Sequence, residues 1–337
     1  MMFSEKLIEP VSEASPAGDE GVYTQPFQEL TALAEYLAAR LEHAEFERMA
    51  RVEFSGENAE SDQRMAASNV EDSRRKLDRA EAAVKEVTGR SPSLEGARDA
   101  VRDRAERMLT ETGKDLRVVQ SLALAWTLEQ GVAGLQAGFR LADALLERYA
   151  EQLHPQPDED DPSDVSAREM VVSEMLNGDA FVAALRETVL LEAPGVGRFT
   201  GRDTEVIDGK LDDDGSGGAR SVPHITGIAQ AVAASAMGDA NEMLLVVSSQ
   251  LDDCLHAADQ VVSRFAAGAI IGDRVLKLLH RARNLLKAAM QAEAPTEDAM
   301  NAAGSSEIAP IMVQGVCSVP APAPVPGRCA AATTPAA

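Results

Sequence analysis

The chain has 337 residues, in which 55 Asp and Glu oppose 32 Lys and Arg for a formal net charge of −23. So negative a chain lacks the phosphate-neutralising surface of a nucleic-acid-binding protein and is disfavoured on an anionic membrane, so no partner of either kind is expected. No stretch approaches the roughly 18 apolar residues of a membrane span, and the start shows no signal peptide, which predicts a cytoplasmic protein without membrane insertion.

Apolar residues recur at helical spacing along most of the chain, while runs with a two-residue period are scarce, so the sequence predicts an all-α protein. The first helix is predicted to begin near Pro26, because proline suits the first helical turn. One face of this helix consists of Phe27, Leu30, Leu33, Leu37 and Leu41. Residues 51–90 are crowded with charge and sparsely apolar, and we favour a loop followed by an exposed helix over partial disorder.

Two helices are predicted in the next part of the chain. The first opens at Ser91-Pro92 and ends at Gly113. Asp115 can cap the second helix by accepting backbone N–H bonds, and Gly131 ends it. Apolar residues cover so much of the second helix that we expect it to be deeply buried.

A further helix is predicted between Gly134 and Pro155, and it has the clearest apolar period in this half of the chain. The residues of its stripe are Leu135, Phe139, Ala142, Leu145, Leu146, Tyr149 and Leu153. Two shorter helices are predicted at 164–176 and 179–185. They complete a first helical domain that spans residues 10–208.

The character of the chain changes at residues 188–222. We expect Gly195, Gly197 and Gly201, together with the run LDDDGSGGAR, to exclude a regular helix there. Residues 209–222 are therefore the predicted Gly/Asp-rich connector between two helical domains.

Residues 223–293 are the predicted second helical domain. A long helix opens at Asp239 and its partner begins at Asp273, which predicts an antiparallel hairpin over 239–293. The stripe of the long helix consists of Leu244, Val247, Leu251, Cys254, Ala258, Val261 and Phe265. We interpret this stripe as core of its own domain, with pairing of two chains as the alternative. Residues 294–337 are rich in Pro and Ala and are predicted to be a disordered tail.

The sequence offers no recognisable catalytic or ligand-binding constellation. Its histidines are scattered without a nucleophile motif. The acidic runs 158–161 and 212–214 lack the full calcium-loop pattern and are interpreted as solvated turns. Gly195, Gly197 and Gly201 miss the dinucleotide fingerprint by one residue. The three cysteines have no metal-ligand spacing, and Cys254 is interpreted as a small buried hydrophobe. We expect no enzyme, no cofactor and no metal.

Several fragments, taken in order, resemble one protein family. They are SPAGDE at 15–20, KDLRVV at 114–119, the glycines 131, 134 and 138, LLERYAEQLHPQPDEDDP at 145–162 and GRFTGRDTEVIDG at 197–209. Over residues 10–210 they resemble the ImpA N-terminal domain of TssA-type subunits of the type VI secretion system. The sequence departs from that pattern in having Ala150 where the family usually has tryptophan, and a longer charged stretch at 51–90.

The resemblance marks a set of motif residues, to which we assign structural roles. They are Lys114, Asp115, Leu116, Arg117, Gly131, Gly134, Tyr149, Leu153, His154, Pro155, Arg198, Phe199, Arg202 and Asp203. Arg117 is expected to bridge to a neighbouring acid, and His154 to satisfy the carbonyls left exposed where the helix breaks.

The resemblance implies a non-enzymatic organiser of baseplate, tail tube and sheath assembly that binds those components. Family members often end in an oligomerising domain after a Pro-rich linker, whereas this sequence stops in such a linker. We therefore expect truncation or a frameshift, and a monomer or a homodimer rather than a large ring. The alternatives are a generic helical scaffold unrelated to secretion, and a hydrolase with an unrecognised acidic site.

Overall fold

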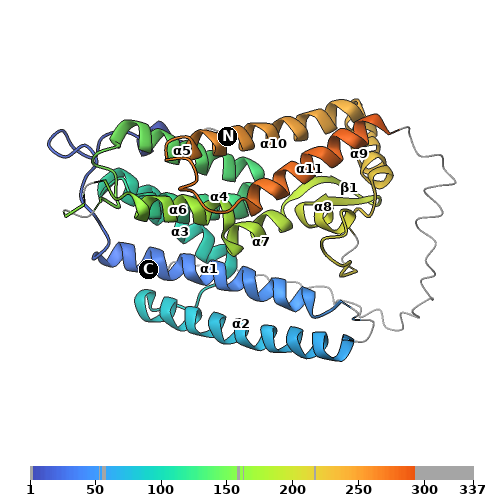
Figure 1. Ribbon diagram of the computed structural model, residues 1–337, viewed down its shortest axis with the longest axis horizontal. Coiled ribbons are helices and arrows are strands. Elements are labelled where there is room, and N and C mark those ends of the chain that lie inside the picture. The colour runs from blue at the N-terminus through green and yellow to red at the C-terminus, as the bar shows by residue number, and fades with distance from the viewer. Residues whose placement is uncertain are drawn as a thin grey trace, which may run out of the picture. The chain divides into compact units, whose positions relative to one another are not determined.

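Helices dominate the structure, as the spacing of apolar residues predicts (Figure 1). The computed structural model describes residues 3–52, 54, 58–157, 160–161, 163–215 and 218–292. These residues belong to one compact unit that spans residues 1–295. The all-α class is confirmed, while the tail predicted at 294–337 lies outside the described residues.

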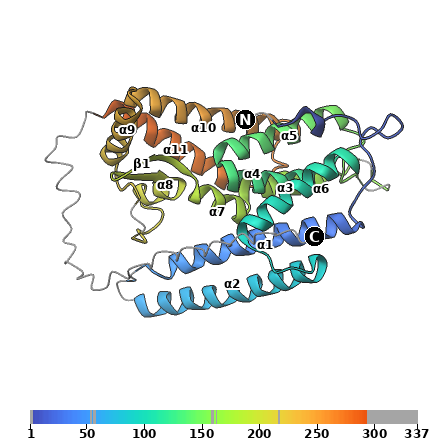
Figure 2. The same cartoon turned by 180° about the vertical axis from the view of Figure 1, so that it is seen from behind.

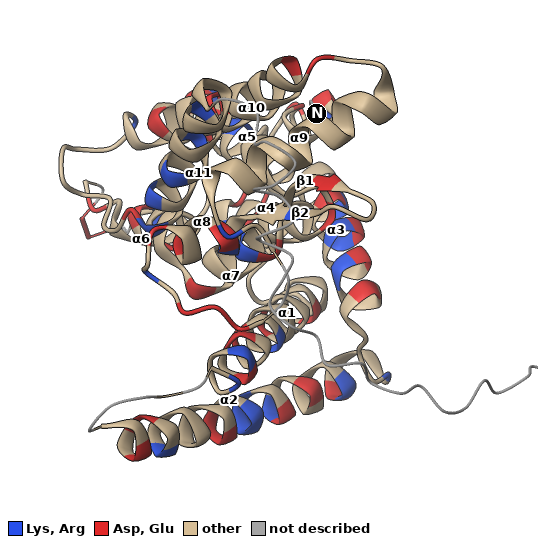
Figure 3. Cartoon of the chain, turned by 90° about the vertical axis from the view of Figure 1, so that its right-hand side faces the viewer, with Lys and Arg blue, Asp and Glu red and all other residues tan. Residues whose placement is uncertain are grey.

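Helices α1 (Gln25–Met49) and α2 (Ala59–Thr88) lie side by side along one edge of the unit (Figures 1 and 2). A proline begins α1, as predicted. The exposed helix predicted between residues 51 and 90 is α2, which buries only Ser73, Leu77 and Val84. Basic and acidic residues alternate along it (Figure 3), and several pair at the i,i+4 spacing that stabilises an exposed helix.

Helices α3 (Leu94–Glu111), α4 (Leu116–Gln130) and α5 (Val132–Tyr149) follow α2. A short turn of 3₁₀ helix, Glu5–Leu7, lies near the start of the chain, ahead of α1. The Asp115 side chain caps α4, as the sequence predicts, whereas α3 is capped by Ser93 and begins at Leu94, shortly after the predicted opening at Ser91-Pro92. α4 packs against α3 and α5, and nearly all its apolar residues are buried.

Helices α6 (Ser166–Asn177) and α7 (Asp179–Glu187) match their predicted positions. The expectation of no regular helix at 188–222 is wrong. An antiparallel hairpin of β1 (Val189–Ala193) and β2 (Gly197–Thr200) is followed by the short helix α8 (Gly201–Ile207). α8 forms because Thr200 and Asp203 make a reciprocal capping box at its first turn.

Helices α9 (Val222–Ala236), α10 (Ala240–Val262) and α11 (Arg274–Gln291) complete the unit. α10 packs on α5, α9 and α11, and this contact buries its stripe: Leu244, Leu251, Cys254, Ala258 and Val261 have no exposed surface. These five residues are thus core of this chain, while Val247 and Phe265 of the predicted stripe are partly buried, and pairing of two chains stays a prediction. Helices on both sides of the connector share the compact unit, and the division into two domains stays a prediction.

Among the described helices, none combines the length and apolar character that crossing a membrane requires.

Candidate functional site

The motif residues that follow α3 lie at a turn held from both sides by backbone hydrogen bonds. Lys114 N donates to Ala17 O at 2.7 Å, which ties the turn to the segment ahead of α1. His154 N donates to Lys114 O at 2.9 Å, and Leu116 N donates to His154 O at 2.9 Å. The turn therefore joins the start of the chain to the segment that follows α5.

The side chain of Lys114 has no exposed surface. Its Nζ donates to Leu7 O at 3.0 Å and also to Leu109 O. The pKa of Lys114 is lowered to about 8, chiefly by burial and also by the nearby Arg148, while Glu9 opposes the shift. A buried ammonium is costly unless it is hydrogen-bonded, and the two carbonyls supply those bonds. Lys114 in turn gives both carbonyls a donor, so its role is structural.

The depressed pKa of Lys114 predicts a pH-dependent stability. In the folded chain Lys114 loses its proton near pH 8, whereas a lysine of the unfolded chain keeps its proton to about pH 10.4. Within this window the unfolded state binds more protons, so the free energy of unfolding should rise with pH. Urea unfolding from pH 7 to pH 10 should show wild type gaining stability relative to Lys114→Met. Parallel pH profiles for the two proteins would contradict the assignment.

Asp115 and Arg117 form a charged group at the first turn of α4. Asp115 Oδ1 accepts from Arg117 N at 2.8 Å, which caps the helix. Arg117 Nη2 donates to Asp115 Oδ2 at 2.6 Å and to Glu20 Oε1 at 2.7 Å. The guanidinium also lies 5.3 Å from the ring centre of Phe27, within the range of a cation–π contact. Arg117 thus holds α1, α4 and the segment ahead of α1 together.

The end of α5 is fixed by two further motif residues. Tyr149 Oη donates to Ile8 O at 2.8 Å, and Leu153 is fully buried. The His154–Pro155 peptide bond is cis. These contacts bring the start of the chain against the end of α5.

The expectation that His154 satisfies the carbonyls at this helix end is wrong. Arg168, buried in α6, donates to Ala150 O at 2.6 Å, to Pro155 O at 2.8 Å and to Leu153 O. The planar guanidinium carries enough donors to reach three carbonyls at once, which an imidazole cannot do. Nothing in the sequence distinguishes Arg168 from an exposed helical arginine.

Gly131 and Gly134 allow α4 and α5 to meet. Gly131 has a φ of +60°, a conformation that favours glycine. A Cβ on Gly134 would lie 2.0 Å from the backbone oxygen of Trp126. Both positions therefore require glycine because of the tight connection between the two helices.

The later motif residues lie in and around β2 and α8. Phe199 is fully buried, whereas Arg198 is exposed and its backbone oxygen accepts from Ala219 N at 2.9 Å. Asp203 Oδ2 accepts from Thr200 N at 2.7 Å as part of the capping box. This segment therefore packs through Phe199 and is tied to the connector by its backbone.

Arg202 belongs to a buried group of ion pairs that we call the Glu45 cluster, formed by Glu45, Arg186, Arg202 and Glu205. Arg202 Nη1 lies 2.8 Å from Glu45 Oε2, and Arg186 Nη1 lies 2.9 Å from Glu45 Oε1. Arg186 Nε lies 2.7 Å from Glu205 Oε2, and Arg281 of α11 also reaches Glu205, at 3.3 Å. The cluster joins α1, α7, α8 and α11, which lie far apart in the sequence.

The sequence predicts that the acids at 212–214 are solvated, and for Asp214 this is wrong. Asp214 is 3.2 Å from Arg202, with only 5% of its side chain exposed. Arg220 pairs with Asp213 and lies 3.2 Å from Asp203. The connector folds back on α8, which brings these acids to arginines that sequence spacing does not reveal. Of the earlier acidic run, Asp158 and Glu159 lie outside the described residues.

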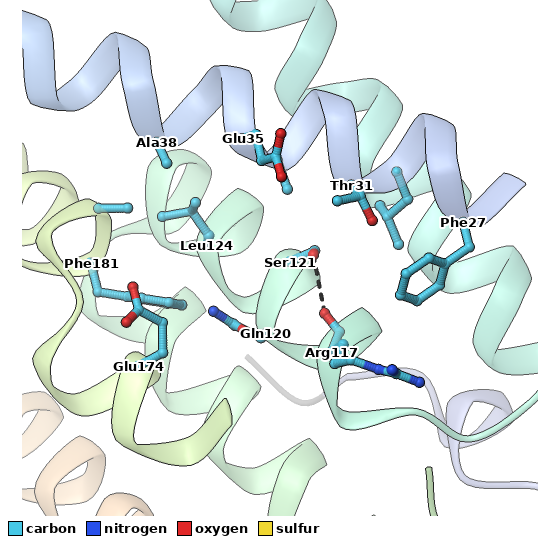
Figure 4. A pocket seen from close by; sticks show the side chains of 13 residues that line it. Phe27, Thr31, Glu35, Ala38, Arg117, Gln120, Ser121, Leu124, Glu174 and Phe181 are labelled. Atoms are coloured by element: carbon cyan, nitrogen blue, oxygen red, sulfur yellow. Dashed lines mark hydrogen bonds between the residues drawn. The ribbon is translucent and has the colours of Figure 1, made fainter. Parts of the chain in front are cut away.

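An elongated groove lies between α1 and α4, and α6 and α7 close one end of it (Figure 4). We call it the α1–α4 groove; its volume is about 300 Å³. Phe27, Thr31 and Glu35 line it from α1. Its wall on α4 and its closed end are formed by Arg117, Gln120, Ser121, Leu124, Glu174, Ala180 and Phe181. The motif residue Arg117 thus stands at the open end of the groove.

Two carboxylates of the groove, those of Glu35 and Glu174, form no ion pair or hydrogen bond with any described residue. Burial raises the pKa of Glu174, Asp179 raises it further, and Arg274 and Lys76 oppose the shift. Neither carboxylate is hydrogen-bonded to a nucleophile or a histidine of the lining.

Two other residues with reactive side chains, His43 and Cys254, have structural surroundings. Within the described part of the chain, no group of His, Cys, Asp and Glu is arranged to hold a metal ion. His43 Nδ1 lies 3.0 Å from Ser73 Oγ and links α1 to α2. Cys254 is fully buried, and its burial raises the pKa of the thiol, so it is a poor nucleophile.

The chain is similar to known proteins in both sequence and structure. The family model "ImpA, N-terminal, type VI secretion system" matches residues 8–177. No curated protein matches the sequence closely enough to count as a relative. A solved structure, the N-terminal domain including the conserved ImpA_N region of the TssA component of the type VI secretion system from Burkholderia cenocepacia, superimposes with a TM-score of 0.51. It is 18% identical, and the match covers 85% of this chain and 92% of that chain.

The structural likeness supports the fold, and the sequence match shows the family because it extends over half of the chain. It covers the Lys114 turn, the glycines of the α4–α5 connection and the end of α5, although the role of each motif residue within the family stays a prediction. The chain belongs to the ImpA N-terminal family of the type VI secretion system.

Proposed function

We propose that the chain is a non-enzymatic assembly protein that works in the cytoplasm and binds baseplate, tail tube and sheath proteins of a type VI secretion machine. The observation that carries the proposal is the family match over residues 8–177. The α1–α4 groove supports it, since its lining combines apolar and polar side chains, and no nucleophile of the lining is paired with a base. Contact surfaces, rather than a reaction centre, would then perform the function.

A binding experiment with single components tests this proposal. The full chain is immobilised and presented separately with purified baseplate, tube and sheath proteins from the same organism. A helical protein of similar net negative charge serves as the control for unspecific attraction. We expect at least one component to be retained above this control. Retention of none would overturn the proposal and favour a helical scaffold unrelated to secretion.

A further inference from the structure

Glu174 of α6 and Ala180 of α7 narrow the α1–α4 groove at one end without sealing it, because both residues also line a second hollow. This hollow, of about 260 Å³, shares Ala38, Glu174 and Ala180 with the groove and reaches Glu42 of α1. Together the two hollows follow α1 from Phe27 to Glu42, a length of roughly 22 Å at 1.5 Å per helical residue. A groove of this length matches about 15 residues of a helix laid along it.

The lining of the groove suits apolar side chains. Phe27 is half-buried at the open end of the groove, while Leu124 of α4 and Phe181 of α7, only 5% and 1% exposed, form an apolar floor beneath it (Figure 4). Ala34 and Ala38 keep the rim on α1 low. Low walls of small residues admit the backbone of a second helix, and the apolar floor receives side chains at every third or fourth position.

The charge left uncompensated in the groove is negative. Arg117 is neutralised by Asp115 and Glu20. At the far end, Lys76 pairs with Glu42, and Arg274 lies 2.6 Å from Asp179.

By contrast, the carboxylates of Glu35 and Glu174 form no ion pair or hydrogen bond with a described residue, although Arg274 and Lys76 attract Glu174 from farther away. Both lie along the lining (Figure 4). A ligand that carries cations beside its apolar side chains would supply the missing partners.

We propose that this groove binds a basic amphipathic helix of a partner protein, with apolar residues on the floor and Lys or Arg side chains at Glu35 and Glu174. The inference rests on the proposed function in one respect only, namely that the partner protein that contributes the helix is a secretion component. The chemistry of the helix follows from the groove itself.

Fluorescence anisotropy with synthetic helices tests the proposal on the full chain. The probe is a labelled helical peptide of about 15 residues, with leucines along one face and lysines beside them in an alanine background. One control peptide replaces the leucines with alanine at unchanged charge, and another replaces the lysines with glutamate. We expect saturable binding of the first peptide and weak or no binding of both controls.

Variants of the chain place the binding in the groove. Glu35→Gln with Glu174→Gln should weaken binding about 2- to 30-fold, because two ion pairs at partly exposed sites are lost. Ala34→Trp, which fills the groove, should weaken it by about 30-fold, as when the centre of an interface is disrupted. The matched control changes Glu86 and Glu111 to glutamine, because these two exposed acids lie outside the groove and form no ion pair or hydrogen bond with a described residue.

Circular dichroism confirms that each variant is folded. Binding that is equal in all variants, equal for the alanine peptide, or absent would overturn the proposal. If wild type and Ala34→Trp retain secretion components equally, the groove is not the binding site, and the proposed function still stands. If the peptide binds in the groove but no secretion component is retained, the groove is a helix-binding site and the proposed function is wrong.

Discussion

Replacing Leu145 with alanine should lower the free energy of unfolding by about 2 to 5 kcal/mol. Leu145 has no exposed surface and lies in α5, which packs against both α4 and α10. Removal of its terminal carbons leaves a cavity between helices that cannot close without moving their backbones. Urea unfolding followed by circular dichroism measures the change.

Leu245→Ala is the matched control for this experiment. Leu245 lies in α10 with 60% of its surface exposed, so the same chemical change should alter stability by no more than about 0.5 kcal/mol. Equal effects at the two positions would show that α5 is not the buried centre described here.

Replacing Glu45 with alanine should destabilise the chain by about 2 to 4 kcal/mol, near the low end for a broken buried ion pair. The change leaves Arg186 and Arg202, whose side chains are 13% and 4% exposed, without the carboxylate they share. Arg186 keeps Glu205 and Arg202 keeps Asp214, which limits the loss.

Glu187→Ala serves as the comparison for Glu45. Glu187 pairs with Arg48 at the surface, where 43% of the acid side chain and 28% of the arginine side chain are exposed. Water can replace that partner, so the expected loss in urea unfolding is about 1 kcal/mol or less. A Glu45→Ala variant as stable as Glu187→Ala would mean that the Glu45 cluster contributes little to the fold.

The helices could be predicted from the sequence because their determinants are local. Pro26 lies in the first turn of α1 and Asp115 caps α4, and the apolar stripes after them face the core. Helix periodicity needs only neighbouring residues, so α1, α4 and α5 were expected near their observed positions.

The missed features depend on contacts between distant segments. The β1–β2 hairpin is two short strands with little alternation, and α8 is only seven residues long. Arg168 reaches across to the end of α5, and Glu45 meets arginines more than a hundred residues away. Such pairs have no sequence spacing from which to recognise them.

The groove could not be predicted for the same reason. Its lining comes from α1, α4, α6 and α7, and each contributes residues that look unremarkable in its own stripe. Glu35 and Glu174 were not singled out in the sequence, because an unpaired acid is visible only when its surroundings are known.

The attachment of α2 sets how this part of the chain can fluctuate. α1 is its main neighbour, and Leu77, Val84 and the His43–Ser73 hydrogen bond are its chief anchors. Peeling α2 away would break few apolar contacts, while its own i,i+4 ion pairs would preserve the helix. Opening at this edge thus requires less free energy than unfolding around α4 and α5, and it would uncover the side of α1 opposite the one that other helices hold.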